Sequence, residues 1–296
     1  MTWIGVDWGA GELRAWVHSG NHVLPLHPHA GTATLAAGEF EPALLALIGS
    51  HLPPEGLTPV ICCGTVGASE AWGEVPYVAV PATPPDAHNA RHVDTQDPRL
   101  DVYILAGMSQ VSPPDVMRGE ETRIAGFIAA NPDWDGVLCL PGRHTKWAHI
   151  SAGEVVSFAT AMTGEIFDLL AGQSVLREAI GQGGWDVDAF DQSVSDAMSR
   201  PERVAGALFS LRAAAELEGM SPATARARLW GWLIGTELAA MRPYWLGQQV
   251  ALIGVQAVSH PYAEALSRQG VAVESVLAEE MTLNGLRRAY SSLIET

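Results

Sequence analysis

The sequence predicts an α/β protein of two lobes, each of which begins with a small β-sheet and ends with helices and further strands. The chain of 296 residues is long enough for two domains of ordinary size. Hydrophobic residues make up 48% of it and charged residues 17%, which is typical of a globular protein with a buried core. The order of the predicted elements at the N-terminus also recurs after about residue 133, which indicates a duplicated plan.

The first copy of this plan lies at the N-terminus. The apolar run 3–7 predicts a buried strand, and the glycine-containing turn 8–11 separates it from an alternating strand at 13–17 that contains Trp16. A second turn and a third strand follow over residues 19–24. Four further elements complete this lobe: a helix at 39–48, buried strands at 60–63 and 102–105, and a surface loop at 81–99.

The second copy starts with the apolar strand 136–140 and the turn 141–142. A strand at 145–150 that contains Trp147 and a third strand at 155–158 then repeat the order found at the N-terminus. The remainder is mainly helical and comprises helices at 163–176, 201–218, 222–246 and 261–268, strands at 249–253 and 271–275, and a terminal helix.

The charge of the chain argues against nucleic acid as a partner. Asp and Glu number 33 and Lys and Arg number 17, which gives a formal net charge of −16 at pH 7. Nucleic-acid-binding proteins usually have a basic face, which this composition does not favour. No apolar run approaches the roughly 18 residues of a membrane span, and the N-terminus does not have the pattern of a signal peptide. We therefore expect neither nucleic acid nor a membrane as a partner.

The three cysteines lie in apolar, strand-like runs. Cys62 and Cys63 are adjacent and Cys139 is distant from both, so no spacing typical of a metal site occurs. Buried, reduced thiols and a cytoplasmic location are expected from this pattern.

Two glycine-containing turns follow buried strands and could present backbone N–H groups to phosphate oxygens: Asp7–Gly11 and Pro141–Lys146. Neither has the Walker or the Rossmann glycine pattern, and either one alone could be a plain hairpin turn. Their equivalent places in the two copies favour a phosphate-binding role. Lys146 is the only lysine of the chain, and its ammonium is suited to meeting a phosphate as a point charge. The alternative is an arginine-biased composition in which one lysine remains by chance.

Seven short motifs, in order along nearly the whole chain, resemble the 2-dehydro-3-deoxygalactonokinase family: Ile4-Gly5-Val6-Asp7-Trp8-Gly9, Leu13-Arg14-Ala15-Trp16, Met117-Arg118-Gly119-Glu120-Glu121-Thr122, Leu140-Pro141-Gly142-Arg143-His144-Thr145-Lys146-Trp147, Met162-Thr163-Gly164-Glu165, Leu233-Ile234-Gly235-Thr236-Glu237-Leu238 and Leu252-Ile253-Gly254. The resemblance implies a two-lobed actin-like ATPase (ribonuclease H-like) fold, with ATP in an interlobe cleft. It also implies Mg²⁺ and the phosphorylation of a 2-keto-3-deoxy sugar acid. The first lobe, residues 1–132, would hold the first phosphate loop and the sugar acid. The second, residues 133–296, would hold the second phosphate loop and the adenosine.

The resemblance assigns residues to the nucleotide. Four residues from each turn would lie near the phosphates: Asp7, Gly9, Ala10 and Gly11 from the first, and Gly142, Arg143, Thr145 and Lys146 from the second. Asp7 would also hold Mg²⁺ through water, since this ion usually keeps several of its waters. Gly254 would end the strand that lies against adenine or ribose. Without the resemblance, Asp7 is interpreted as a turn-capping residue and Gly254 as an ordinary strand-to-helix glycine.

The residues expected to act on the sugar acid lie shortly before the second copy. By analogy with related carbohydrate kinases, Glu120 is the candidate for the base that accepts the hydroxyl proton, with Glu121 as the near alternative. Arg118 would bind the substrate carboxylate through two parallel hydrogen bonds. The alternatives are a pair of carboxylates that stabilises a helix start, and a surface salt bridge of Arg118.

Three residues depart from the family pattern. Ala10 and Gly11 stand where the family usually has Ser or Thr, and Arg143 replaces a threonine of the second loop. The changes remove side-chain donors near the phosphates. They leave open a catalytically impaired member of the family that binds a ligand or a partner. The sequence also leaves the oligomeric state open, with a homodimer as one alternative.

Overall fold

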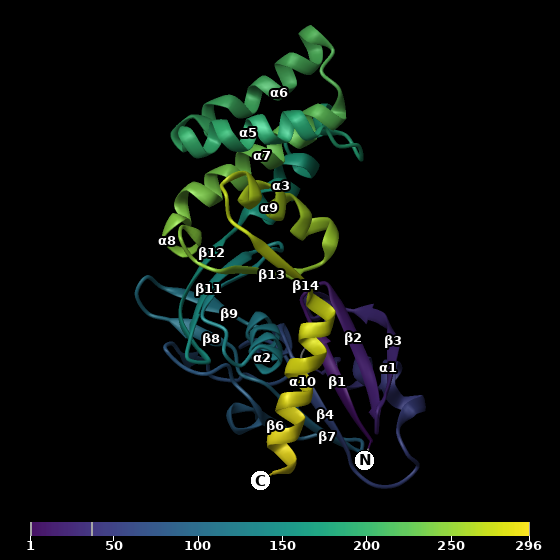
Figure 1. Cartoon of the computed structure of the whole chain (residues 1–296). Coiled ribbons are helices and arrows are strands. Elements are labelled where there is room, and N and C mark those ends of the chain that lie inside the picture. Colours follow the sequence, from purple (N-terminus) through teal and green to yellow (C-terminus); the bar gives the residue numbers. More distant parts are fainter. Residues whose placement is uncertain (1, 37, 296) are drawn as a thin grey trace. The chain divides into compact units, whose positions relative to one another are not determined.

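A computed structural model of the chain describes residues 2–36 and 38–295. Contacts between Cα atoms divide the chain into two compact units. The first unit comprises the residues up to Asp135, Ile150–Ser157 and the segment from Leu277 onward, and the second comprises Gly136–His149 and Phe158–Val276. In each unit a sheet lies among helices (Figure 1).

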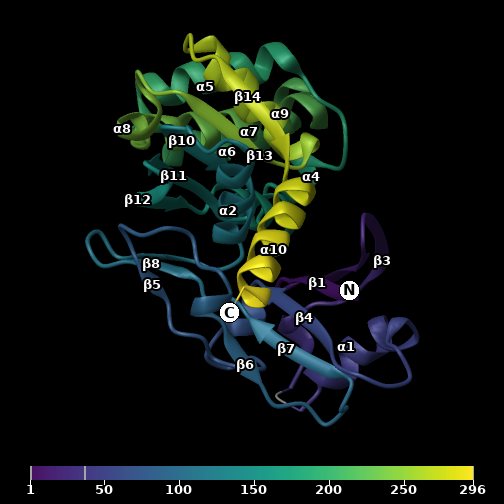
Figure 2. The same cartoon turned by 60° about the horizontal axis from the view of Figure 1, so that its bottom comes forward.

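The main sheet of the first unit has the strand order β3-β2-β1-β4-β7-β6. Its strands are β1 (Thr2–Trp8), β2 (Glu12–Ser19), β3 (His22–Ala30), β4 (Thr58–Cys63), β6 (Arg91–Val93) and β7 (Leu100–Ile104). The strands β1, β2 and β3 form an antiparallel meander, while β4 is parallel to both β1 and β7. Figure 2 shows β4 and β7 side by side. The expected strands are confirmed, and the expected loop at 81–99 also contains the edge strand β6.

Both faces of β1 are buried because helices cover the sheet on both sides. Ile4 and Val6 pack in a core with α1 (Phe40–Ile48), whereas Trp3 packs in another core with α10 (Ala278–Ile294). Alternate side chains of a strand point to opposite faces, so one apolar run can supply two cores. This explains why the first strand is apolar at nearly every position.

The terminal helix belongs to the first unit. Although the sequence predicts one C-terminal lobe over residues 133–296, α10 packs along α2 (Glu120–Ala130) and β1 (Figure 1). The two helices are in such close contact that a Cβ on Gly126 would lie 1.9 Å from the carbonyl oxygen of Met281. The apolar pattern of a helix indicates that it covers a sheet but does not indicate which sheet. The range 133–296 therefore does not form one unit.

A small sheet in the first unit leads into α2. It has the order β5-β8-β9, formed by β5 (Val78–Ala79), β8 (Met108–Gln110) and β9 (Asp115–Met117). Strand β9 ends directly before Arg118, so this sheet fixes the start of the segment that carries the expected sugar-acid residues.

The sheet of the second unit has the order β12-β11-β10-β13-β14. Its strands are β10 (Gly136–Leu140), β11 (Thr145–Ser151), β12 (Glu154–Ala161), β13 (Val250–Gly254) and β14 (Val273–Leu277). Numbered within each sheet, four strands of both follow the order third, second, first, fourth, and a later strand, β7 or β14, lies beside the fourth, which confirms the duplicated plan. The tip of the β11–β12 hairpin groups with the first unit, where Val155 and Ala82 exchange two backbone hydrogen bonds.

The helices of the second unit are α3 (Thr163–Gln173), α4 (Arg177–Ile180), α5 (Val187–Ser199), α6 (Val204–Glu218), α7 (Pro222–Ala240), α8 (Arg242–Trp245) and α9 (Gln256–Arg268). Helix α5 is not predicted from the sequence, although Asp186 caps its start by accepting a hydrogen bond from the Ala189 amide. It packs closely on α7, where a Cβ on Gly231 would lie 2.6 Å from the Phe190 carbonyl oxygen. The helix expected at 222–246 is interrupted before Pro243, since proline has no amide hydrogen for the next turn.

Candidate active site

Three backbone segments meet in the first unit at the ends of β1 and β4 and at the start of α2. A Cβ on Gly64, which follows β4, would lie 2.6 Å from the carbonyl oxygen of Trp8. Gly119, at the start of α2, is close to the same segment, since its Cβ would lie 3.2 Å from the Gly64 Cα. Both glycines have positive φ angles, of 100° and 109°, which other residues rarely adopt. The glycines therefore bring together the parts of the chain that carry the expected functional residues.

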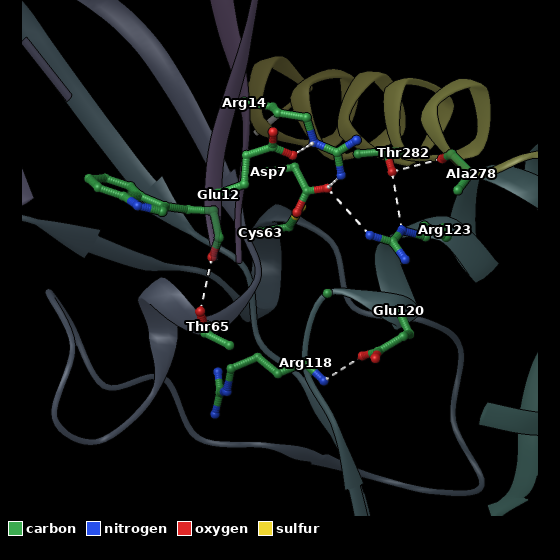
Figure 3. Close-up of polar contacts among 12 residues, drawn as sticks. Asp7, Glu12, Arg14, Cys63, Thr65, Arg118, Glu120, Arg123, Ala278 and Thr282 are labelled. Atoms are coloured by element: carbon green, nitrogen blue, oxygen red, sulfur yellow. Dashed lines mark hydrogen bonds and ion pairs between the residues drawn. The ribbon is translucent and has the colours of Figure 1, made fainter. Parts of the chain in front are cut away.

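Asp7 lies at this junction with two arginines on its carboxylate (Figure 3). Its Oδ2 accepts hydrogen bonds from Arg14 Nη2 at 2.8 Å and from Arg123 Nη2 at 3.4 Å. The other oxygen, Oδ1, is 3.9 Å from the thiol sulfur of Cys63. Asp7 itself is only 5% exposed, so the two guanidinium groups offset the cost of burying its charge.

Different elements supply the two arginines. Arg14 is directly opposite Asp7 in the β1–β2 hairpin, so the register of a hairpin alone could have identified it. Arg123 comes from the first turns of α2, and its Nε donates to the Thr282 hydroxyl of α10 at 3.4 Å. Its place near Asp7 depends on the packing of two helices, which the sequence did not reveal.

Some backbone groups of the turn after β1 already form hydrogen bonds within the protein. The Gly9 amide donates to the Glu12 carbonyl at 2.9 Å, so it is not available as the phosphate donor expected from the sequence. The Gly9 and Ala10 carbonyls accept hydrogen bonds at 3.0 Å from Thr32 and Ala33 in the segment after β3. Ala10 and Gly11 are exposed at the tip of the turn.

Two threonine hydroxyls, which the sequence analysis missed, lie beside this turn. Thr65 Oγ1 donates to the Trp8 carbonyl at 3.1 Å and is 2.7 Å from Thr32 Oγ1. Because the single proton of Thr65 goes to Trp8, Thr32 must be the donor between the two hydroxyls. Both protons are used to hold the turn, so these hydroxyls do not replace the donors that Ala10 and Gly11 lack.

The carboxylates at the start of α2 have different surroundings. Both oxygens of Glu121 accept from the Gly119 amide, at 2.8 and 2.7 Å, and Glu121 is 1% exposed. Burial, with a contribution from the charge of Glu120, raises the pKa of Glu121 to about 7. Glu120 is half-buried, and its Oε2 accepts from the Arg118 amide at 3.1 Å. Glu121 is thus buried against the start of its own helix, and Glu120 is the more accessible carboxylate.

Arg118 forms no ion pair within the described residues, which argues against the surface salt bridge considered above. Its guanidinium carbon lies 4.2 Å from the centre of the Tyr77 ring, and its Nη2 donates to the Val75 carbonyl at 2.9 Å. Its Nη1 is buried and has no hydrogen-bond partner among these residues. A Cβ on Gly67 would lie 2.8 Å from this nitrogen, so the glycine leaves room for it. A buried donor without an acceptor is unfavourable and fits an anionic ligand.

In the second unit, the turn after β10 rests against the start of α3. The Glu165 amide donates to the Arg143 carbonyl at 3.0 Å, and a Cβ on Gly164 would lie 2.4 Å from the Gly142 carbonyl oxygen. The Glu165 carboxylate binds His144 at 2.6 Å and Arg143 at 3.0 Å, and the hydrogen bond from His144, supported by Arg143, lowers the pKa of Glu165. This role of Glu165 was not predicted from the sequence. Arg143 is thus turned toward a carboxylate of its own unit.

The other expected residues of this turn are mostly buried. Lys146 is 5% exposed, and its Nζ donates to Thr160 Oγ1 of β12 at 2.7 Å. Thr145 is fully buried, and its hydroxyl is 2.9 Å from the Tyr262 hydroxyl. Gly142 has open space where a Cβ would be, whereas a Cβ on Gly254 would lie 2.2 Å from Ser259 Oγ. Gly142 is therefore the open point of this turn, whereas the Thr145 side chain is turned into the core.

The sequence matches the family described as 2-keto-3-deoxy-galactonokinase over residues 7–289. The chain belongs to this family. It is 34% identical to a Rhizobium meliloti protein named as a probable 2-dehydro-3-deoxygalactonokinase, over 97% of this chain and 96% of that protein. A crystal structure from Sinorhizobium meliloti, whose protein also carries a 2-dehydro-3-deoxygalactonokinase name, superposes with a TM-score of 0.90 at 33% identity. That match covers 98% of this chain and 99% of the other.

The fold also occurs outside this family. An activator of 2-hydroxyisocaproyl-CoA dehydratase from Clostridium difficile has a TM-score of 0.53 at 13% identity, covering 100% of this chain and 98% of the other. The expected actin-like ATPase fold is confirmed. The site residues expected from the sequence stay predictions, with Asp7, Arg118 and Glu120 in the first unit and Gly142 and Lys146 in the second.

Residues 2–36 and 38–295 contain no group of three or more His, Cys, Asp or Glu side chains arranged to hold a metal ion. None of their helices is both long and apolar enough to cross a membrane.

Proposed function

We propose that this chain is an ATP-dependent kinase that transfers the γ-phosphoryl group of ATP to a hydroxyl of a 2-keto-3-deoxy sugar acid of the 2-dehydro-3-deoxy-D-galactonate type. Membership of the 2-keto-3-deoxy-galactonokinase family supports the reaction. The observation that carries the proposal in this molecule is the pair Arg118 and Glu120. A buried guanidinium nitrogen of Arg118 has no hydrogen-bond partner among the described residues, and the accessible carboxylate of Glu120 is held by the Arg118 backbone amide.

Arg118 would bind the carboxylate of the sugar acid. The Tyr77 ring and the Val75 carbonyl hold the guanidinium, so its orientation is fixed before the substrate arrives. A fixed guanidinium recognises a carboxylate through two parallel hydrogen bonds, which also orients the rest of the molecule. A neutral sugar offers Arg118 only uncharged oxygens, which accept weaker hydrogen bonds than a carboxylate does, so this residue would favour acids.

Glu120 would accept the proton of the reacting hydroxyl. In the transfer, the hydroxyl oxygen forms a bond to the γ-phosphorus, the bond from that phosphorus to the β-bridging oxygen breaks, and ADP leaves. The hydroxyl proton passes to the Glu120 carboxylate. Because phosphoryl transfer depends mostly on positioning and electrostatic stabilisation, Lys146 would stabilise the charge on the transferred group, with Gly142 contributing an open backbone approach.

The groups around Asp7 leave one way for this residue to bind Mg²⁺, which is through water from its Oδ1 atom. The Oδ2 atom is bound by Arg14 and Arg123, and the described residues contain no cage of several carboxylates. Mg²⁺ is commonly bound through substrate phosphates, waters and one or two carboxylates, which matches a contact from Oδ1 of Asp7 through water. When bound, the ion would neutralise phosphate charge. ATP and Mg²⁺ are therefore expected to bind together.

The test is a coupled assay of ADP release on a panel of 2-keto-3-deoxy acids and the matching neutral sugars. We expect turnover with at least one acid, and a loss of about 10²–10⁴-fold in kcat for Glu120→Gln, the scale of positioned acid–base help. Glu280→Gln is the control, because Glu280 is exposed on α10 of the same unit. An inactive parent chain would overturn the function and favour a catalytically impaired family member. A loss below tenfold in Glu120→Gln would remove Glu120 as the base.

We further propose a cytoplasmic homodimer. A cytoplasmic location agrees with the use of ATP and with the three buried free cysteines. Light scattering after gel filtration would test the assembly, with an expected mass near twice the 31.4 kDa of one chain. A mass near that of a single chain would contradict the dimer.

A further inference from the structure

A buried carboxylate lies behind the turn that carries Lys146. Glu237 of α7 is 4% exposed, and its Oε1 accepts from the Trp147 indole nitrogen at 2.7 Å. Its Oε2 accepts from the Tyr262 hydroxyl at 2.7 Å and from the Thr163 hydroxyl. The three donors come from β11, α9 and α3, so this one side chain connects four elements of the second unit.

Glu237 sets the direction of the hydrogen bonds that reach the turn. Its Oε2 accepts the single proton of the Tyr262 hydroxyl. The Tyr262 oxygen must then accept from Thr145, 2.9 Å away. Thr145 is therefore bound through its own proton to a chain of hydrogen bonds that ends at Glu237, which explains why a residue of the phosphate-binding turn is fully buried.

This chain of hydrogen bonds fixes the orientation of Lys146. In β11, Thr145 and Trp147 lie on either side of Lys146 in the sequence, and both are connected to Glu237. Successive side chains of a strand point to opposite faces, so fixing Thr145 and Trp147 on one face fixes the direction of Lys146 on the other.

The Thr163 contact acts on the same turn from another side, because α3 begins at Thr163 and its next residues pack on Gly142 and Arg143.

We propose that Glu237, acting through Tyr262 and Thr145, is a positioning residue that holds the Lys146 turn in the geometry needed for phosphoryl transfer. The inference rests on the proposed function for its kinetic part. A carboxylate suits this role because it can accept several hydrogen bonds and has no N–H group to compete with its donors. Burial raises the pKa of Glu237, so the site retains this carboxylate despite a cost in stability.

The decisive variants are Tyr262→Phe and Glu237→Gln. Tyr262→Phe keeps the ring and removes only the link between Thr145 and Glu237. Glu237→Gln keeps the size and replaces one acceptor with a donor. The matched control is Trp245→Phe, which removes one buried hydrogen bond, from the indole to the Leu238 carbonyl at 2.8 Å, elsewhere in the same unit. All three variants should lower the melting temperature, so stability alone does not distinguish a positioning role from a structural one.

Kinetics and hydrogen exchange distinguish them. Tyr262→Phe and Glu237→Gln should lower kcat by about 10- to 100-fold, the scale expected when a reacting group is misplaced, while the KM of the sugar acid stays within about twofold of the parent value. Trp245→Phe should keep both constants. In hydrogen-exchange mass spectrometry, the amides of a peptide over residues 141–147 should exchange about tenfold faster in Tyr262→Phe and Glu237→Gln than in the parent chain. Their exchange rate should not change in Trp245→Phe.

The outcomes separate the two hypotheses. If the parent chain turns over no sugar acid, the proposed function fails, and hydrogen exchange alone still decides whether Glu237 holds the turn. If the parent is active and Tyr262→Phe behaves as Trp245→Phe does in both measurements, the positioning role is overturned. Should Tyr262→Phe not fold, Thr145→Val, which breaks the same chain at its other end, provides the same comparison.

Discussion

The two glycine-containing turns have the same place in their sheets, yet their functional side chains are held by different means. In the first turn, charge holds Asp7 directly, through Arg14 and Arg123, whose side chains stay 31% and 26% exposed. In the second turn, a buried set of hydrogen bonds that ends at Glu237 holds the neighbours of Lys146. One backbone plan can therefore orient a side chain through ion pairs near solvent or through hydrogen bonds in a buried core. The two turns should respond differently to mutation.

The largest effect is expected at Asp7. Asp7→Asn keeps the shape of the side chain but leaves two guanidinium groups without a counter-charge and weakens the proposed contact with Mg²⁺. We expect kcat to fall about 10²–10³-fold, as when one preorganised electrostatic contact is removed, with a much smaller change in ATP affinity. Steady-state kinetics and calorimetry of ATP binding measure the two quantities.

Glu12→Gln is the control for Asp7→Asn, because Glu12 also pairs with Arg14, at 3.4 Å, and is half exposed. It should keep kcat within about twofold, as expected for an exposed pair of low energy. Equal kcat values for Asp7→Asn and the parent would show that the charge of Asp7 is not used in the reaction.

A smaller loss is expected from Lys146→Arg, although the charge is conserved. Lys146 is 5% exposed and donates to Thr160, so a planar guanidinium does not fit in the place of the ammonium. We expect kcat to fall at least about tenfold and the KM for ATP to rise. Full activity of the variant would show that the second turn tolerates a change in the shape of this side chain. The two turns would then not differ in the way proposed above.

A buried carboxylate also lies behind each turn: Glu121 behind the first and Glu237 behind the second. The shifted pKa of Glu121 can be tested through the pH dependence of stability. Its pKa is raised from an ordinary value of 4.5 to about 7, so the folded protein retains a proton that the unfolded chain releases in this range. The free energy of unfolding should therefore fall as pH rises from 4.5 to about 7 and then level off. At about 1.4 kcal/mol per pH unit, this group accounts for a fall of about 3 kcal/mol.

Glu121→Gln should lack this part of the pH dependence, which urea unfolding between pH 4 and pH 8 would measure. Gln still offers an oxygen to the Gly119 amide, so the start of α2 should survive the change. Glu280→Gln serves as the exposed control from the same unit. An unchanged pH profile in Glu121→Gln would mean that Glu121 is already ionised at acidic pH in the folded protein.

The smallest effect is expected at Arg143, whose side chain is 65% exposed in its ion pair with Glu165. Arg143→Thr restores the residue usual in the family and should change the free energy of unfolding by less than about 1 kcal/mol. The Glu165 amide would still hold the backbone of the turn. A gain in kcat above about tenfold would show that Arg143 obstructs the nucleotide site, and this arginine would then explain any weak activity of the parent chain.

The sequence by itself determined the strands, the two turns and the duplicated order, because apolar periodicity and glycines are local signals. It also contained the pair of Asp7 and Arg14, since the register of one hairpin sets them opposite each other. Only the tertiary structure decided which side chains meet across long separations. Arg123 reaches Asp7 from 116 residues away, and Glu237 meets Trp147 from 90 residues away.

The tertiary structure also decided which expected residues are buried among other side chains and which stay accessible. Thr145 and Glu121 carry the residue types of a binding site, but Tyr262 buries the first and the Gly119 amide occupies the second. A sequence pattern specifies the chemical group at a position. Whether that group faces a ligand or the core depends on helices such as α9 and α10, whose apolar faces could cover either sheet until the chain has folded.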